Sequence, residues 1–331
     1  GTYLLTGFGA GGYTIKPSKP GGPNSSITSN DAARVAQGVV GSPAFVSQNQ
    51  RFAADTSGNG GVTSNDAALI ARFAAGLSGT FRAGQWFFFV TGAPSPLPTA
   101  PQTYNDNRTY ASVSSALTGQ DFVALLVGEA SGNYNPAVHP RPAMGPERST
   151  TVVAPRLVTP ADNEVIIPVS VTGAADKEII SYEFDLRYDP TVIQPQENPV
   201  DVSGTVSRGL LAVANPNEPG LLRVVLYGPY PIDSNGLLLN LRFNAVGAPG
   251  SISPLTFERM MFNEGDPGTL VTDGQIQLSG AAANQAEISG RLLNSMGQGI
   301  PNARVTLTDT TDKSVSIVSN GFGVYRFGGL Q

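Results

Sequence analysis

Apolar and polar residues alternate in short segments through the second half of the chain. Glu164–Thr172 is a clear example, because every second residue in it is apolar. The other segments with strand-like patterns are Ile179–Tyr188, Leu221–Tyr227, Leu237–Phe243 and Gly274–Leu278. A period of two places successive side chains on opposite faces of a strand. Short strands separated by turn residues are typical of a β-sandwich, so residues 150–280 are predicted to form one.

A second pattern, in the first quarter of the chain, has the period of a helix and occurs twice. The hexapeptide Thr-Ser-Asn-Asp-Ala-Ala fills residues 28–33 and recurs 35 residues later at 63–68. Apolar residues at helical spacing follow each copy, and Gly41 and Gly76 lie where helices commonly end. We predict two short helices that pack on each other, because neither can bury enough apolar surface alone. A third short helix is predicted at 119–128.

The composition agrees with short elements and argues against several classes of function. Of 331 residues, 39 are glycine and 26 are proline, while charged residues make up 14%, a composition that favours turns over long charged helices. A net charge of −5 without basic runs argues against nucleic acid as a partner. No segment approaches the ~20 apolar residues of a membrane span. Without cysteine there is no disulfide or zinc–thiolate site, but a large sandwich can be secreted without either.

Enzyme chemistry is poorly supported by the residues present. The single histidine, His139, lies in a Pro-rich stretch predicted to be a linker at 137–149, which leaves Ser–His catalysis without a base. Glu183 and Asp185 share one face of a predicted strand, and glycosidases use pairs of carboxylates. Their spacing equally fits the solvent-exposed face of a half-buried strand, which is the interpretation we adopt. The chain is therefore predicted not to be an enzyme.

The residues before the second helix form a candidate calcium loop that runs from position 55 to position 66. Oxygen-bearing side chains occupy loop positions 1, 3, 5 and 12, and position 7 is a glycine whose backbone carbonyl would contribute. Calcium takes 6–8 oxygen ligands, and alternate positions of a short loop can surround one ion. The predicted ligands are Asp55, Ser57, Asn59, Gly61 and Asp66. The alternative is a turn rich in Asp and Asn that binds no metal.

The corresponding loop before the first helix has fewer candidate ligands. Counting back from Asp31, positions 1 and 3 fall on Pro20 and Gly22, which have no side-chain oxygen. Asn24, the carbonyl of Ser26 and the carboxylate of Asp31 remain as candidates. One calcium ion is therefore predicted in the second loop, and the first loop is either metal-free or a distorted second site.

Two loop-and-helix units at this spacing resemble a dockerin, with residues 18–136 as the module and its extension. The resemblance implies a module that contacts a partner cohesin through loop positions 10 and 11. These positions are Ser29 and Asn30 in the first unit, and Ser64 and Asn65 in the second. Because the two pairs are duplicated, the resemblance also implies two orientations of binding.

The predicted sandwich resembles a cohesin domain. The likeness rests on the strand at 164–171 and on the phrase Ser-Tyr-Glu-Phe-Asp-Leu-Arg-Tyr-Asp-Pro at 181–190. It implies a nine-stranded jelly-roll sandwich over residues 150–280 that binds dockerins, while related sandwiches bind carbohydrate. A structural sandwich without a partner is the alternative, because a fold does not determine a function.

Both ends of the chain resemble parts of one immunoglobulin-like domain of the carboxypeptidase-regulatory-like kind. Residues 287–331 resemble its first part, and residues 1–17, with Gly-Tyr-Thr-Ile at 12–15, resemble its last strands. An incomplete sandwich leaves an unpaired edge. Three arrangements are open: a shortened C-terminal domain, two ends that meet within one chain, or an N-terminus that completes the next copy. The last arrangement would build a head-to-tail filament.

The predicted fold class is mainly β and multidomain, with a small α-helical dockerin-like module, a cohesin-like jelly-roll sandwich, and a partial immunoglobulin-like domain split between the termini. We expect a calcium-binding structural protein, extracellular or on the cell surface, that assembles with its own copies or with a cohesin or dockerin partner. The alternative is a carbohydrate-binding or adhesion segment of a larger surface protein. Tyr227 and Tyr230 are its candidate glycan-binding residues.

Overall fold

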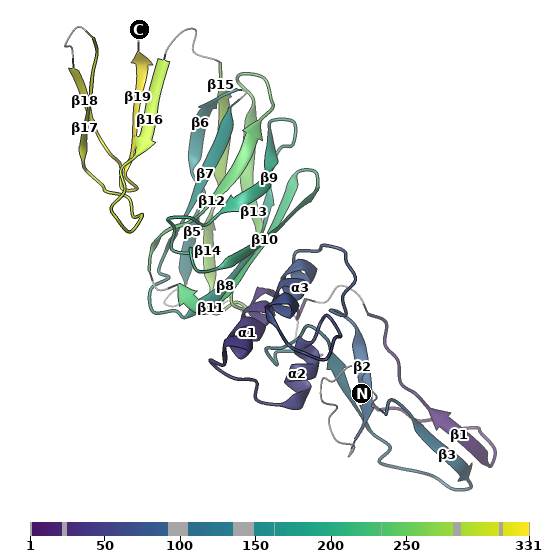
Figure 1. The fold of residues 1–331 in the computed structure, drawn as a ribbon. Coiled ribbons are helices and arrows are strands. Elements are labelled where there is room, and N and C mark those ends of the chain that lie inside the picture. The colour runs from purple at the N-terminus through teal and green to yellow at the C-terminus, as the bar shows by residue number, and fades with distance from the viewer. Residues whose placement is uncertain are drawn as a thin grey trace. The chain divides into compact units, whose positions relative to one another are not determined.

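The computed structural model describes residues 2–21, 25–91, 105–134, 149–161, 163–232, 234–280, 286–310 and 314–330 (Figure 1). The chain forms two units, residues 1–141 with 225–229 and residues 142–224 with 230–331. The predicted linker at 137–149 lies outside the described residues up to position 148, as do His139 and the candidate ligand Asn24. Within the described ranges, no helix combines the length and the apolar character needed to cross a bilayer.

Three helices follow one another in the first unit. α1 (Ser29–Val40) and α3 (Ser64–Ala74) begin at the two copies of the repeat, as predicted, and α2 (Gln48–Ala54) is an additional helix between them in sequence. Both copies of the repeat form a capping box, in which the Thr side chain and the Asp side chain each accept hydrogen bonds from backbone N–H groups. Gly41 ends α1 with a φ of 77°, a left-handed conformation that glycine adopts without strain. α1 packs on α3.

β2 (Trp86–Val90) and β4 (Phe122–Leu126) form an antiparallel pair in the same unit. β4 lies where a third helix was predicted at 119–128, and that prediction is wrong. A short apolar run fits a turn of helix and a strand equally well. Here the strand forms because the backbone of β4 pairs with β2 along its whole length, from Trp86 opposite Leu126 to Val90 opposite Phe122.

Phe52 of α2 is the centre of a small aromatic core in this unit. Its ring centroid lies 5.1 Å from that of Phe89 and 5.2 Å from that of Phe87, edge to face in both cases. Val127 and Leu125 complete the cluster. Such pairs add about 0.5–1.5 kcal/mol each beyond the burial of their area, so α2 is fixed on the β2–β4 pair.

The N-terminal segment contributes one strand to the first unit. β1 (Gly11–Ile15) pairs antiparallel with β3 (Arg108–Val113), and residues 2–9 form no strand. Part of the segment 1–17 is therefore used inside this unit. Its completion of an immunoglobulin-like domain stays a prediction.

Two β-sheets form the predicted sandwich in the second unit (Figure 1). The strand order is β10-β11-β8-β13-β15-β6 in one sheet and β14-β5-β7-β12-β9 in the other. β5 pairs in parallel with β14, and β6 pairs in parallel with β15. The strands are β5 (Thr150–Val153), β6 (Arg156–Pro160), β7 (Glu164–Thr172), β8 (Ile179–Arg187), β9 (Ile193–Asp201), β10 (Leu211–Glu218), β11 (Leu221–Ile232), β12 (Gly236–Ala245), β13 (Ile252–Phe262), β14 (Thr269–Thr272) and β15 (Gly274–Ser279).

The core of the sandwich follows from the predicted alternation. Val165, Ile167, Val169 and Val171 of β7 are all buried, as are large side chains of β8 and β12. Fully burying one such side chain stabilises the fold by about 1.5–3 kcal/mol. The hydroxyl of Tyr182 is 2.8 Å from that of Ser207, and burial raises the pKa of Tyr182, so its polar end is satisfied as a neutral group.

The C-terminal residues form two separate strand pairs. β16 (Ala286–Arg291) pairs with β19 (Val324–Leu330), and β17 (Arg304–Thr308) pairs with β18 (Ser314–Val318). Among the side chains described here, that of Phe327 is the single apolar one that is buried. These strands therefore lack the packed interior of a complete sandwich.

Candidate docking face and calcium loop

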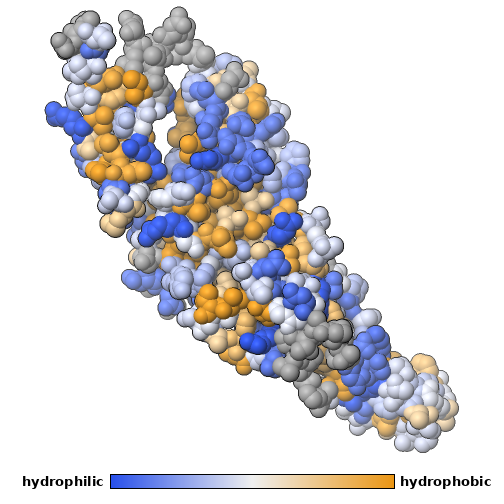
Figure 2. Space-filling view, in the orientation of Figure 1, coloured by the Kyte–Doolittle hydropathy of each residue, from blue (hydrophilic) through white to orange (hydrophobic). Residues whose placement is uncertain are grey.

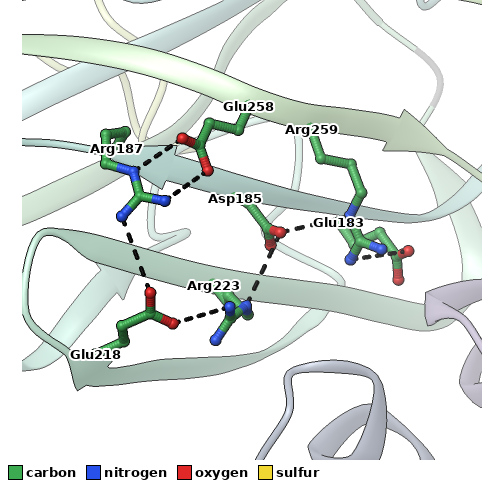
Figure 3. A network of polar contacts seen from close by, with 7 residues as sticks. All are labelled: Glu183, Asp185, Arg187, Glu218, Arg223, Glu258 and Arg259. Atoms are coloured by element: carbon green, nitrogen blue, oxygen red, sulfur yellow. Dashed lines mark hydrogen bonds and ion pairs between the residues drawn. The ribbon is translucent and has the colours of Figure 1, made fainter. Parts of the chain in front are cut away.

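The six-stranded sheet carries paired charges on the face opposite its core (Figure 3). On β8, Phe184 and Leu186 are buried in the sandwich. Glu183, Asp185 and Arg187 alternate with them and therefore lie on the other face. This set of charges, with its partners on neighbouring strands, is called the charged face below.

A β-bulge brings two consecutive residues of β13 to the charged face. The register between β8 and β13 shifts between Phe257 and Arg259, so Glu258 is the extra residue. Phe257 lies opposite Leu186, while Arg259 lies opposite Asp185. A bulge interrupts the alternation of side chains, which is why Glu258 and Arg259 can both contact charges of β8 (Figure 3).

Arg187 is held between two carboxylates. Its guanidinium donates two hydrogen bonds of 2.9 Å to Glu258 and lies 3.9 Å from Glu218. The hydrogen bond from Arg187 holds the pKa of Glu258 below its usual range, and the same bond raises the pKa of Arg187. Exposed ion pairs contribute little to stability. The bidentate geometry instead fixes the direction in which both groups point.

Two further arginines extend the network across the strands. Arg223 on β11 donates a 2.9 Å hydrogen bond to Glu218 and lies 3.9 Å from Asp185. Arg259 pairs with Glu183 at 3.2 Å and lies 3.9 Å from Asp185. The charged face thus presents both signs of charge in a fixed arrangement, a property that favours selective recognition of another charged surface.

Glu183 differs from its predicted environment. Only 1% of its side chain is exposed, against 21% for Asp185, so the prediction that both lie on a solvent-exposed face is wrong for Glu183. A buried carboxylate needs an opposite charge or hydrogen bonds, and Arg259 provides the charge.

The predicted calcium loop is folded around the fully buried carboxylate of Asp55. Its Oδ1 accepts hydrogen bonds from the backbone N–H groups of Gly58 and Asn59, at 2.9 and 3.2 Å. Its Oδ2 accepts one from Gly60 at 3.0 Å, and the hydroxyl of Ser57 lies 3.3 Å from Oδ1. The first residue of the loop therefore organises the turn that follows it.

Asp66 closes the loop and is also fully buried. Its Oδ1 accepts a 2.9 Å hydrogen bond from the N–H of Ser57, and its Oδ2 accepts one of 2.9 Å from the N–H of Thr63. The structure thus brings together three of the predicted ligands at positions 1, 3 and 12. Asn59 Oδ1, at position 5, accepts the N–H of Gly61 at 2.8 Å.

Arg82 places a positive charge against this loop. Its Nη1 lies 3.8 Å from Asp55 Oδ2, and its guanidinium carbon lies 5.1 and 4.5 Å from the ring centroids of Phe52 and Phe87. Gly58 permits the approach, because a Cβ there would lie 2.5 Å from Arg82 Cδ. Cations over aromatic faces are stabilised by the ring quadrupole, so the position of Arg82 is determined by both the rings and the carboxylate.

The residues of this loop fit one calcium ion. The loop holds two fully buried carboxylates, and the guanidinium of Arg82 lies against one of them, Asp55, so a divalent cation would neutralise the negative charge that remains. In the described part of the chain, no three His, Asp or Glu side chains converge on a metal site. Ser57, Asn59 and the Gly61 carbonyl would therefore have to supply the remaining oxygens. When bound, the ion would join the loop to α3 electrostatically.

The first repeat uses its aspartate differently. Asp31 is fully buried, and its Oδ1 accepts hydrogen bonds from the N–H groups of Ala130 and Ser131, at 2.8 and 2.9 Å. Its Oδ2 accepts a 2.8 Å hydrogen bond from the N–H of Thr28. The carboxylate proposed as a ligand thus contacts backbone amides on both sides, and the Ser26 carbonyl is the other candidate ligand in the described chain.

The two predicted pairs of partner-binding residues are not equivalent in the structure. Ser29 and Asn30 are buried, whereas Ser64 and Asn65 are exposed at the start of α3. Only the second pair is therefore available to a partner in this structure. The duplicated sequence gave no sign of this difference.

Sequence reasoning missed three features of these sites. The motif Thr-x-x-Asp is a capping-box signature, so the repeat also marked the helix starts. The role of Arg82 and the Arg187–Glu258 pair were not identified. Both depend on contacts between distant parts of the chain, and no local motif signals either one.

A comparison with known protein families finds a match for the sandwich. Residues 150–278 match the model of the cohesin domain family, which agrees with the predicted resemblance of this region. Cohesin domains are non-catalytic scaffold modules, so for residues 150–278 the match agrees with the prediction of no enzyme activity. No curated protein matches the chain.

Several solved cohesins are similar to this region. The sixth cohesin of scaffoldin B from Acetivibrio cellulolyticus, solved with a dockerin, is 20% identical with a TM-score of 0.34, covering 40% of this chain and 99% of that one. A non-cellulosomal cohesin from Archaeoglobus fulgidus is 19% identical with a TM-score of 0.34, covering 40% and 94%. A cohesin from Clostridium acetobutylicum is 20% identical with a TM-score of 0.35, covering 41% and 94%.

Proposed function

We propose that this protein is a non-catalytic, extracellular assembly protein whose cohesin-like sandwich docks a dockerin-like helical module of a second copy through the charged face. The observation that carries the proposal is the network of Arg187, Arg223 and Arg259 with their carboxylates on the sheet formed by β10, β11, β8 and β13. The family match to residues 150–278 supports a docking role for this sandwich.

The charged face suits recognition because its charges are fixed before binding. Arg187, Glu258 and Glu218 are each 42–50% exposed, yet the hydrogen bonds hold them in one geometry. Preorganised charges lose less conformational entropy on binding than free side chains do. Their pattern of signs also disfavours partners with the wrong charges.

Reversing one charge tests this docking face. We expect Arg187→Glu to weaken self-association of the full chain by about tenfold or more, because it places like charges beside Glu258 and Glu218. Sedimentation velocity in calcium over a range of concentrations measures the effect. Arg156→Glu, on the exposed side chain of β6 in the same sheet, is the control and should change little.

A double variant separates docking from folding. Arg187→Glu with Glu258→Arg retains an ion pair while inverting its direction, so it should fold normally and still associate weakly. Unchanged self-association in both the single and the double variant would contradict the proposed face.

We further propose that copies join head to tail when the N-terminal segment of one copy adds strands to the C-terminal region of another. That region buries Phe327 alone among its described apolar side chains, and Figure 2 shows hydrophobic residues on its surface. Its exposed apolar residues are Ile288, Leu293, Met296, Ile300, Val315, Val318, Phe322 and Val324. Unpaired strand edges beside exposed apolar groups favour the addition of another strand.

The N-terminal segment has the properties of the strand that would be added. Tyr3, Leu4, Leu5 and Phe8 are 50–84% exposed, and residues 2–9 form no strand in the chain itself. Donor and acceptor are different surfaces of one chain, so each copy would bind the next. Such a head-to-tail interface builds a filament when the rotation between copies does not close into a ring, and we propose the filament.

Substitutions in the donor segment test the filament. Leu4→Lys with Leu5→Lys should abolish filaments seen by electron microscopy. Consecutive residues of an added strand face opposite sides, so one of the two lysines would have to be buried in the acceptor, which is prohibitive. Val46→Lys, at a residue that is 86% exposed in the same unit, should leave them intact. A synthetic peptide of residues 2–16 should shorten the filaments by occupying the acceptor. Filaments that form in the double variant and keep their length in the presence of the peptide would contradict strand addition.

The alternative glycan-binding function lacks its predicted platform. Tyr230 is 67% exposed, but Tyr227 is buried at 2% exposure, so the two rings do not form one exposed surface for stacking on a sugar. We therefore favour assembly over glycan recognition.

A further inference from the structure

We infer that the helical module binds calcium only in its second repeat, and that the backbone of residues 130–131 replaces the metal ion of the first. This goes beyond the docking role and is independent of it. The two repeats have the same hexapeptide, but the aspartate that it contains accepts hydrogen bonds from different parts of the chain in each repeat.

The two aspartates share one half of their environment and differ in the other. Oδ2 of Asp31 and Oδ2 of Asp66 each accept the N–H of the capping threonine, at 2.8 and 2.9 Å. Oδ1 of Asp66 accepts the N–H of Ser57, from its own loop. Oδ1 of Asp31 instead accepts two N–H groups, from Ala130 and Ser131, far away in the sequence.

The segment that reaches Asp31 is itself held rigidly. Glu129 Oε1 accepts the N–H groups of Gly132 and Asn133, at 2.6 and 2.9 Å. The side-chain amide of Gln50 in α2 donates to the carbonyl of Ala130 at 2.9 Å. The two amides are therefore directed at the Asp31 carboxylate before any ion could bind, and adjacent N–H groups of this kind form an anion-binding concavity.

A calcium ion in the first repeat would have to displace these bonds and find other ligands. Hydrogen bonds to a charged group are stronger than neutral ones, and the donors left buried would lose their partner. Pro20 has no side-chain oxygen and position 22 is a glycine, so Asn24, the Ser26 carbonyl and Asp31 are the candidate ligands of this loop. Calcium takes 6–8 oxygen ligands, which is more than these three residues supply. The residues of the first repeat thus do not fit a calcium ion.

This arrangement makes the module asymmetric. The first repeat is tied to the β2–β4 extension by Asp31. The second repeat has two buried carboxylates, Asp55 and Asp66, whose N–H donors come from the loop between them, so an ion could enter that loop without breaking a contact to a distant segment. The exposed pair Ser64 and Asn65 lies at the calcium-dependent end. Only that end is therefore expected to respond to changes in calcium concentration.

Calcium stoichiometry of the full chain tests the inference. Isothermal titration and elemental analysis after desalting should give one ion per chain. Asp31→Asn should leave that stoichiometry and the dissociation constant unchanged within about threefold. It should lower the melting temperature, followed by the fluorescence of Trp86, by the same amount in calcium and in EGTA. Trp86 is the single tryptophan of the chain and belongs to this unit.

Two matched variants make the result decisive. Ser131→Pro removes one of the two donor N–H groups without touching either loop, and should lower the melting temperature as Asp31→Asn does. Asp66→Asn should remove calcium binding. Two ions per chain, falling to one in Asp31→Asn, would overturn the inference. Self-association is not measured here, so failure of the docking proposal would leave this result unaffected.

Discussion

Replacing Asp55 by alanine is expected to abolish calcium binding and to lower the free energy of unfolding of the first unit by about 3–5 kcal/mol. The carboxylate is fully buried and accepts hydrogen bonds from Gly58, Asn59 and Gly60. Its removal leaves these N–H groups without their acceptor and Arg82 without its anion. Urea unfolding followed by Trp86 fluorescence measures the loss.

Asp121→Ala is the matched control for this prediction. Asp121 is an exposed acid immediately before β4 in the same unit, so its removal should change the free energy of unfolding by less than about 0.5 kcal/mol. An Asp55→Ala variant as stable as the Asp121→Ala control would show that the loop is not organised around this carboxylate.

Arg82→Met is expected to have opposite effects without and with calcium. Methionine can keep the packing on Phe52 and Phe87, but it removes the charge that lies 3.8 Å from Asp55. Without calcium, the buried carboxylate of Asp55 then lacks the positive charge of Arg82, and we expect a loss of about 2–3 kcal/mol in the free energy of unfolding. In calcium, the ion no longer meets a like charge, so its dissociation constant should fall by about tenfold, which corresponds to 1.4 kcal/mol.

Lower stability in EGTA together with tighter calcium binding would identify the guanidinium of Arg82 as a competitor of the ion. Arg72→Met, at an exposed position of α3, should leave both the stability in EGTA and the calcium affinity unchanged. A variant of Arg82 that loses stability equally in calcium and in EGTA would assign Arg82 a packing role alone.

The sandwich could be predicted because the burial pattern of its strands is visible in short stretches of sequence. On β7, every second residue is apolar and buried, namely Val165, Ile167, Val169 and Val171, and the predicted bounds of this strand coincide with the observed ones. The helix starts were predictable for the same reason, since Thr28 and Thr63 precede regular helical patterns.

The contacts that distinguish the two repeats could not be predicted, because they join residues far apart in sequence. Asp31 contacts Ala130 across almost one hundred residues, and the hexapeptide is identical in both repeats. The strand β4 was missed for a related reason, since a short apolar run takes its conformation from the strand it pairs with. Local sequence determines which chemical groups are present, but the residues packed around them in the fold determine their hydrogen-bond partners and their conformation.

The parallel pairing of β6 with β15 has a mechanical consequence. The sandwich begins at β5 and β6 and ends at β15, and β6 lies directly against β15 in parallel. Tension that pulls residue 156 and residue 279 in opposite directions would therefore shear these two strands past each other. Shear loads all the hydrogen bonds in the ladder between the two strands at the same time, whereas peeling breaks them one after another. A chain linked into a long fibre would bear load through this ladder.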